Sequence, residues 1–106
     1  MKWFFLLVAG CFEVLWAIGL KYSFGLTRLV PSIFTILGMI ASFYFLSLAL
    51  KYLPLGTAYA IWTGIGTVGT IILGIFLFKE TMNISKVIFI GFIILGIIGL
   101  KLSSSN

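Results

Sequence analysis

The sequence predicts an all-α membrane protein with four transmembrane helices, because of its composition and the spacing of its charges. The chain has 106 residues, of which 62% are hydrophobic and only 8% are charged, and its mean hydropathy is +1.30. A soluble domain carries about 25% charged residues, so this chain has too few charges to cover a globular surface in water. The few charges separate long apolar segments, and the alternating polarity of a transmembrane β-barrel is missing.

Each apolar segment has a length suited to crossing the bilayer, which requires about 20 residues of helix. The predicted helices cover about residues 3–20, 29–50, 55–78 and 84–101, within one transmembrane domain that comprises residues 1–106. The fourth has the shortest uncharged core, at 87–100, which is about 21 Å of helix. Lys86 and Lys101 lie at its ends and can reach the headgroups. Its glycines and branched side chains indicate a helix used for packing or dimerisation.

Several other classes of site are excluded. Cys11 is the only cysteine and histidine is absent, so neither an intramolecular disulfide nor a cysteine metal cluster is expected, and we predict no metal and no cofactor. The segment 64–69, GIGTVG, matches a dinucleotide-binding pattern, but it lies inside a predicted span without the strand that such a site requires. The basic residues are scattered along the chain, which argues against a nucleic-acid surface.

The first residues, MKWFFLLVAGC, have the outline of a lipoprotein signal. A cleaved signal is normally followed by a polar mature segment. Here the next residues, FEVLWAIGL, only continue the apolar run, so an uncleaved first helix is the better interpretation.

The basic residues are almost evenly divided between the two sides of the membrane. Four spans place Lys2, Lys51 and Lys101 on one side, and the other side carries four basic residues: Lys21, Arg28, Lys79 and Lys86. The positive-inside rule fixes orientation through a clear excess, so the near tie predicts insertion in both orientations. The alternative, that the amino terminus or one dominant loop decides the orientation, remains open.

Glu13 is the only acidic residue inside a predicted span. An ionisable residue at the centre of a spanning helix costs about 2.5 kcal/mol or more, which makes it a candidate functional residue. One turn away on the same face lie Ala9, Gly10, Trp16 and Ala17. Three of these are small, so another helix or a ligand can approach the carboxyl group. The structural alternative is a protonated glutamate that hydrogen-bonds across helices.

Small and weakly polar residues form stripes at helical spacing on the second and third predicted helices. The second stripe consists of Thr35, Gly38, Ser42 and Ala49, and the third of Gly56, Tyr59, Trp62, Thr63, Gly66 and Thr70. Ser42, Tyr59 and Trp16 are candidate donors to the carboxylate, and Trp62 is a candidate wall of a binding site. For each of them, ordinary helix packing is the alternative.

A single buried carboxylate can couple a cation to a proton. Removal from water favours its protonated form, and a cation that restores a charge partner can displace the proton. If the protein opens alternately to each side, this competition produces antiport. One copy of four short helices has little room for an enclosed pathway, so we expect a homodimer that brings two Glu13 side chains together. Opposite insertion of the two copies would resemble an inverted-repeat transporter.

Two segments, FEVLWAIGLKYSFGLTRLVPS (12–32) and PLGTAYAIWTGIGTVG (54–69), resemble the small multidrug resistance transporters, and the likeness covers nearly the whole chain. The resemblance implies an antiparallel, dual-topology homodimer in the bacterial inner membrane that exports cations in exchange for protons. It also implies that Glu13 binds both proton and substrate. The other implied site residues are Ser42, Tyr59 and Trp62, with Gly64 and Gly66 as flexible glycines.

Trp16, Met39, the Lys79–Glu80 pair and Lys101 resemble the guanidinium-exporting subtype of this family, with Gly10 beside the glutamate. The resemblance predicts a proton-coupled antiporter, not an enzyme, which exports guanidinium and small guanidinyl cations by alternating access. A carboxylate can receive planar guanidinium through two hydrogen bonds while aromatic rings cover its faces. Two alternatives remain: a broader exporter of quaternary ammonium and multidrug cations, and a non-transporting membrane subunit with a structural glutamate.

Overall fold

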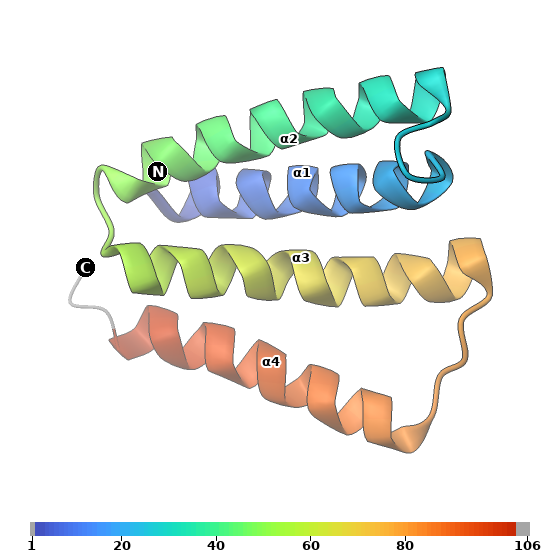
Figure 1. The fold of residues 1–106 in the computed structure, drawn as a ribbon. Coiled ribbons are helices and arrows are strands. Elements are labelled where there is room, and N and C mark those ends of the chain that lie inside the picture. The colour runs from blue at the N-terminus through green and yellow to red at the C-terminus, as the bar shows by residue number, and fades with distance from the viewer. Residues whose placement is uncertain (1, 104–106) are drawn as a thin grey trace.

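A computed structural model describes residues 2–103 and shows four helices (Figure 1). They are α1 (Lys2–Tyr22), α2 (Leu29–Leu50), α3 (Leu55–Phe78) and α4 (Ile84–Ser103), and the described residues contain no strand. Every helix is long and apolar enough to cross a membrane, with a mean hydropathy between 2.0 and 2.2 in its most apolar window. The predicted fold class, an all-α protein with four transmembrane helices, is confirmed. The first helix extends to Tyr22, slightly beyond the predicted range.

Consecutive helices run in opposite directions, so the two ends of the bundle carry different connections (Figure 1). The start of α1, the α2–α3 connection and the end of α4 lie at one end, and the α1–α2 and α3–α4 connections lie at the other. Helix α1 packs against both α2 and α3, whereas α4 packs along α3. No described residue of α4 is buried, so this helix presents most of its surface to the surroundings.

Small residues bring α1 and α2 into close contact. Gly38 lies against the backbone of Trp16, where an added Cβ would be 3.0 Å from the Trp16 Cβ and 3.3 Å from its nitrogen. Further along, Gly19 lies against the hydroxyl group of Thr35. The stripe predicted on the second helix is buried at all four of its positions. Transmembrane helices associate through close backbone approach of this kind, because lipid provides no hydrophobic drive between them.

The tightly packed core lies in the half of the bundle that contains the α2–α3 connection. Its buried members come from α1, α2, α3 and the α2–α3 connection, and they are Leu6, Ala9, Leu46, Ala49, Leu53, Ala58, Ile61 and Trp62. Glu13 lies one turn beyond Ala9 on α1. The carboxyl group therefore projects from the edge of a well-packed region, where its position is defined by the surrounding helices.

The α1–α2 connection is a tight turn organised by Ser23. Its buried hydroxyl group donates to the carbonyl oxygen of Leu20 at 2.7 Å and accepts the backbone N–H of Leu26 at 3.0 Å. Phe24, Gly25 and Leu26 all have positive φ angles, of 48°, 71° and 69°. Such a sequence of left-handed residues reverses the chain in a short distance, which holds α1 and α2 close together.

Candidate functional site

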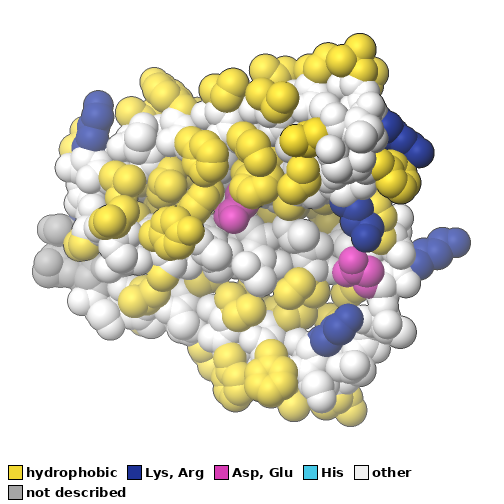
Figure 2. Space-filling model, in the orientation of Figure 1, with side chains coloured by type: hydrophobic (Ala, Val, Ile, Leu, Met, Phe, Trp, Pro, Cys, Tyr) yellow, Lys and Arg dark blue, Asp and Glu magenta, His cyan; other side chains and the backbone are white. Residues whose placement is uncertain are grey.

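The carboxyl group of Glu13 lies against Gly66 of α3, near the middle of the bundle. A Cβ atom added at Gly66 would overlap this carboxyl group and would be 2.9 Å from the Glu13 Cγ. Glu13 is half-buried, and its Oε1 atom is buried without a hydrogen-bond partner in the described chain. Figure 2 shows one of the two acidic side chains midway along the helices among apolar groups, and the other close to basic side chains at one end. The missing side chain of Gly66 thus provides the space that the carboxyl group occupies.

Two further buried polar atoms, one helical turn from Glu13 or from Gly66 along the chain, also lack partners among the described residues. The indole Nε1 of Trp16 and the hydroxyl Oγ1 of Thr63 are buried, and neither makes a hydrogen bond within the described residues. Trp16 lies one turn after Glu13 on α1, and Thr63 lies one turn before Gly66 on α3. Unsatisfied polar groups are costly where no water is present. An acceptor, an N–H donor and a hydroxyl group are therefore available for a polar ligand at one level of the membrane.

Ser42 and Trp62 form a buried chain of hydrogen bonds beside Glu13. The indole Nε1 of Trp62 donates to the Ser42 hydroxyl oxygen at 2.9 Å, and Ser42 donates to the backbone carbonyl of Ala9 at 2.8 Å. These bonds connect α3 to α2 and α2 to α1. The expectation that Ser42 donates to the Glu13 carboxylate is not met in this structure, because its single proton is directed to Ala9.

Aromatic rings surround Trp62. Tyr59 meets it edge to face, with ring centroids 5.3 Å apart and an interplanar angle of 61°, and Phe43 is 5.7 Å away from the other direction. Trp62 is buried, but 55% of the Tyr59 surface is exposed on the single chain. The predicted aromatic pair therefore exists, and its outer member faces away from the core of this chain.

The glycines near Glu13 each make room for a neighbouring helix. A Cβ at Gly10 would be 2.8 Å from the Cβ of Ile65, and a Cβ at Gly64 would be 2.8 Å from the Cδ1 of Ile97 on α4. Helix α3 continues without interruption through Gly64 and Gly66, so their role as a hinge remains a prediction. Met39 is half-buried on α2, directly after the glycine that contacts Trp16.

Lys101 does not approach Glu13 within the chain. Its Nζ atom lies 5.7 Å from the centre of the Trp3 ring, at the end of the bundle where α1 begins. Trp3 precedes Glu13 by ten residues, which corresponds to about 15 Å along a helix. The structure therefore separates this predicted site residue from the cluster around the carboxyl group.

Thr63 belongs to the stripe predicted on the third helix but was not among the predicted site residues. The only signal in the sequence is its spacing, because Thr63 precedes Gly66 by one turn, and three other threonines lie on the same helix. What the sequence could not reveal is that the threonine hydroxyl lacks the intrahelical acceptor that such side chains commonly use.

Removing the Ser42 hydroxyl group should destabilise the helix bundle. Ser42→Ala leaves the buried indole N–H of Trp62 without an acceptor and removes the bond from Ser42 to the Ala9 carbonyl oxygen, so we expect a loss of about 1–2 kcal/mol in unfolding free energy. Denaturant unfolding in detergent, followed by circular dichroism, measures this loss. Ser47→Ala is the matched control, since this serine on the same helix is exposed and bonds only to the Tyr44 carbonyl. Equal losses in both variants would contradict the predicted role of the buried bonds.

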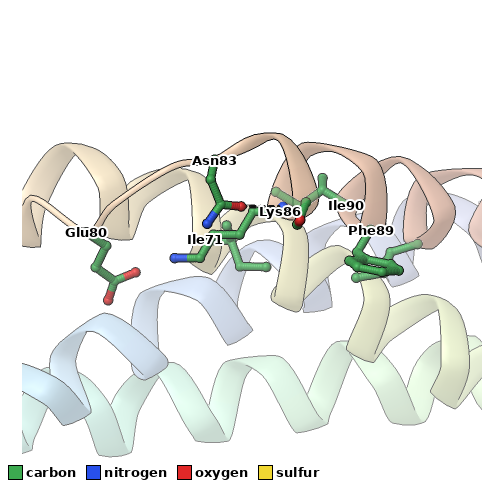
Figure 3. Close-up of a pocket in the computed structure, with 8 residues that line it drawn as sticks. Ile71, Glu80, Asn83, Lys86, Phe89 and Ile90 are labelled. Carbon is green, nitrogen blue, oxygen red and sulfur yellow. Dashed lines mark hydrogen bonds between the residues drawn. The ribbon is translucent and has the colours of Figure 1, made fainter.

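A cavity that does not include Glu13 lies between the end of α3 and the start of α4 (Figure 3). Its volume is about 310 Å³, and it is lined by Ile71, Glu80, Asn83, Ser85, Lys86, Phe89, Ile90 and Ile93. Asn83 accepts the backbone N–H of Lys86 at 2.9 Å, and the Lys86 ammonium donates to the carbonyl of Thr81 at 2.6 Å. In Figure 3 the Lys86 side chain extends towards Glu80, whose carboxyl group lies against Gly74 of α3. Asn83 thus caps the first turn of α4, and Lys86 stabilises the α3–α4 connection. Both lie at one end of the bundle.

Comparison with known proteins identifies the family. The model of the Small Multidrug Resistance protein family matches residues 1–93. The chain belongs to the small multidrug resistance family. This confirms the resemblance of segments 12–32 and 54–69, and it places the chain as a multi-pass protein of the bacterial inner membrane.

Three relatives within the small multidrug resistance family are similar over almost their whole length. A protein named guanidinium exporter from Proteus vulgaris is 59% identical over 98% of this chain and 100% of its own. Proteins of the same name from Yersinia pestis and Salmonella typhimurium are each 57% identical over 98% of this chain, and over 100% and 99% of their own lengths. The similarity thus includes all four helices and the site around Glu13.

Proposed function

We propose that this protein exports guanidinium and small guanidinyl cations in exchange for protons, by alternating access, with Glu13 as the group that binds both. The observation that supports this most directly is the buried Oε1 atom of Glu13, which has no hydrogen-bond partner among residues 2–103 although it lies inside a spanning helix. The names of the relatives that are 57–59% identical support the choice of substrate.

The groups near Glu13 suit a small planar cation. Guanidinium carries N–H donors in one plane, and a carboxylate can accept two of them in parallel. The rings of Trp62 and Tyr59 can cover the faces of such a cation through cation–π attraction. Ser42 fixes the orientation of the Trp62 indole through the 2.9 Å bond, which gives this wall less freedom to adapt to bulky compounds.

Proton coupling follows from competition for one carboxyl group. The protonated form has no charge to attract the cation, and the ionised form that binds the cation has released its proton. If the two occupants exclude one another at Glu13, movement of the cation in one direction requires movement of protons in the other. In the proposed dimer the cation meets two Glu13 carboxyl groups, so its binding displaces two protons and the exchange moves net charge that a transport current records. No second coupling group is needed, and the described part of the chain has no other acidic side chain within its four helices.

The transport unit that we propose is an antiparallel homodimer with dual topology. Tyr59 is exposed on the single chain, and α4 has no buried residue in the described range, so both offer surface to a second copy. The division of basic residues, three on one side and four on the other, is compatible with both orientations. Gly64 and Gly66 are the proposed hinge, and Met39 contributes to the site from beside Gly38.

Transport currents on a solid-supported membrane test this function. Proteoliposomes are exposed to guanidinium and, separately, to tetraphenylphosphonium as a bulky aromatic cation, each across an inward proton gradient. We expect a robust guanidinium current and a far smaller current with the aromatic cation. Strong transport of the aromatic cation without a guanidinium current would instead indicate the broader multidrug exporter. Absence of both currents from folded dimers would indicate a non-transporting subunit.

A further inference from the structure

An apolar groove lies on the outside of the bundle between α1, α3 and α4, at the end where α1 begins. Its volume is about 300 Å³. Leu7, Ile61, Ile65 and Ile97 form part of its floor, and Trp3 and Lys101 lie at the end nearest the helix termini. Tryptophan and lysine are the residues that mark the headgroup level of a membrane. The groove therefore extends from that level towards the hydrocarbon interior.

Two ammonium groups lie close to the Trp3 ring at this end of the groove: that of Lys101, which lines the groove, and that of Lys2, which precedes Trp3 in the chain. The Nζ atoms of Lys101 and Lys2 lie 5.7 Å and 6.0 Å from the centre of the same Trp3 ring. Neither acidic side chain of the same copy lies beside them, since Glu13 lies about three turns further along α1 and Glu80 lies in the α3–α4 connection at the other end. The mouth of the groove is thus positively charged at the depth where lipid phosphates lie.

We propose that this groove binds an anionic phospholipid, with an acyl chain along its apolar floor and the headgroup phosphate between Lys2 and Lys101. Basic pockets between transmembrane helices are suited to anionic headgroups. A second copy of the chain is a poorer occupant. An antiparallel copy would bring the end that carries four basic residues, Lys21, Arg28, Lys79 and Lys86, with the single acidic residue Glu80, which leaves a positive net charge. A parallel copy would bring Lys2, Lys51 and Lys101 again. Either copy would add positive charge to a positive mouth.

Native mass spectrometry of the detergent-solubilised dimer tests the headgroup contact. The protein is offered equal amounts of phosphatidylglycerol and phosphatidylethanolamine with identical acyl chains. We expect preferential retention of phosphatidylglycerol, and a loss of about fivefold in its affinity for each of Lys101→Gln and Lys2→Gln. Lys51→Gln is the matched control, because it removes the same charge at the same end of the bundle, but Lys51 neither lines the groove nor is one of the two lysines over the Trp3 ring. An equal loss in the Lys51 variant, or no loss in the other two, would overturn the proposal.

Fluorescence quenching tests where the acyl chain lies. In a Trp16→Phe/Trp62→Phe variant that remains dimeric, Trp3 is the only tryptophan. Phosphatidylglycerol brominated near the glycerol end of its acyl chains should quench Trp3, and Lys101→Gln should weaken this quenching by the same factor as it weakens binding. Lack of quenching would show that a second copy or another part of the protein covers the groove, and the proposal would fail.

Discussion

Glu13→Gln should abolish the guanidinium current while leaving the protein folded and inserted. Glutamine keeps the size of the side chain beside Gly66 and can still hydrogen-bond, but it has no negative charge and exchanges no proton. A charge-assisted hydrogen bond contributes about 1.5–3 kcal/mol, so loss of two should weaken guanidinium binding at least about a hundredfold. Tryptophan fluorescence titration and transport currents measure both effects.

The wild-type protein should bind guanidinium more weakly as the pH falls. A protonated Glu13 carboxyl group cannot bind the cation. For each proton that guanidinium must displace, its apparent affinity should therefore fall by up to about tenfold for each pH unit of acidification, over the range where the group titrates. The Glu13→Gln variant should show a flat pH profile. Guanidinium affinity that is independent of pH in the wild type would refute the competition on which the proposed antiport depends.

Glu80→Gln is the matched control for the substitution at Glu13. It makes the same chemical change in the other acidic residue, which lies in the connection between α3 and α4. We expect guanidinium currents close to those of the wild type. If instead Glu13→Gln transports normally, or if it fails to assemble while an apolar replacement of similar size assembles well, the glutamate has a structural role only.

Gly66→Ala should displace the Glu13 carboxyl group and weaken guanidinium binding by about tenfold. The added Cβ would overlap this carboxyl group. Overpacking a rigid site destabilises a protein by about 1–3 kcal/mol, but the long Glu13 side chain can rotate away, so the loss in stability should be smaller. The expected signature is therefore a large loss in affinity with a small loss in stability. Isothermal titration of guanidinium and thermal unfolding in detergent measure the two quantities.

Gly56→Ala provides the comparison within the same helix. A Cβ at Gly56 meets no atom within 4 Å, so this substitution should leave guanidinium affinity unchanged. If both alanine variants bind equally well, the contact between Gly66 and Glu13 does not set the position of the carboxyl group.

The fold could be predicted from the sequence because the bilayer imposes simple rules. A spanning segment must be a helix or part of a closed barrel, and the charges of this chain leave four apolar segments of helical length. The contact between α1 and α2 was also predictable in outline, since Thr35, Gly38, Ser42 and Ala49 recur at helical spacing and all are buried. Spacing alone identified the face but not the residue that each position would meet.

The candidate site was predictable in its residues but not in its hydrogen bonds. Glu13 was evident as the single acidic residue within a span, yet its contact with Gly66 depends on the register between α1 and α3. Ser42 has one proton and several possible acceptors, and only the structure shows that it is given to Ala9. Lys101 could be placed at the end of a helix by its charge, but its position over Trp3 depends on how α4 meets α1.

The bonds from Trp62 to Ser42 and from Ser42 to Ala9 also have a mechanical consequence. The Ala9 carbonyl is the intrahelical acceptor for the Glu13 amide. Ser42 is therefore hydrogen-bonded to the same helical turn that carries the Glu13 carboxyl group. Rotation of α1 alone would break the bond from Ser42 to Ala9, and no water is available inside the membrane to replace it. We therefore expect α1, α2 and the first turns of α3 to move together as one rigid body. Most of the bending should then occur in α4 and in the second half of α3, when the protein closes on one side of the membrane and opens on the other.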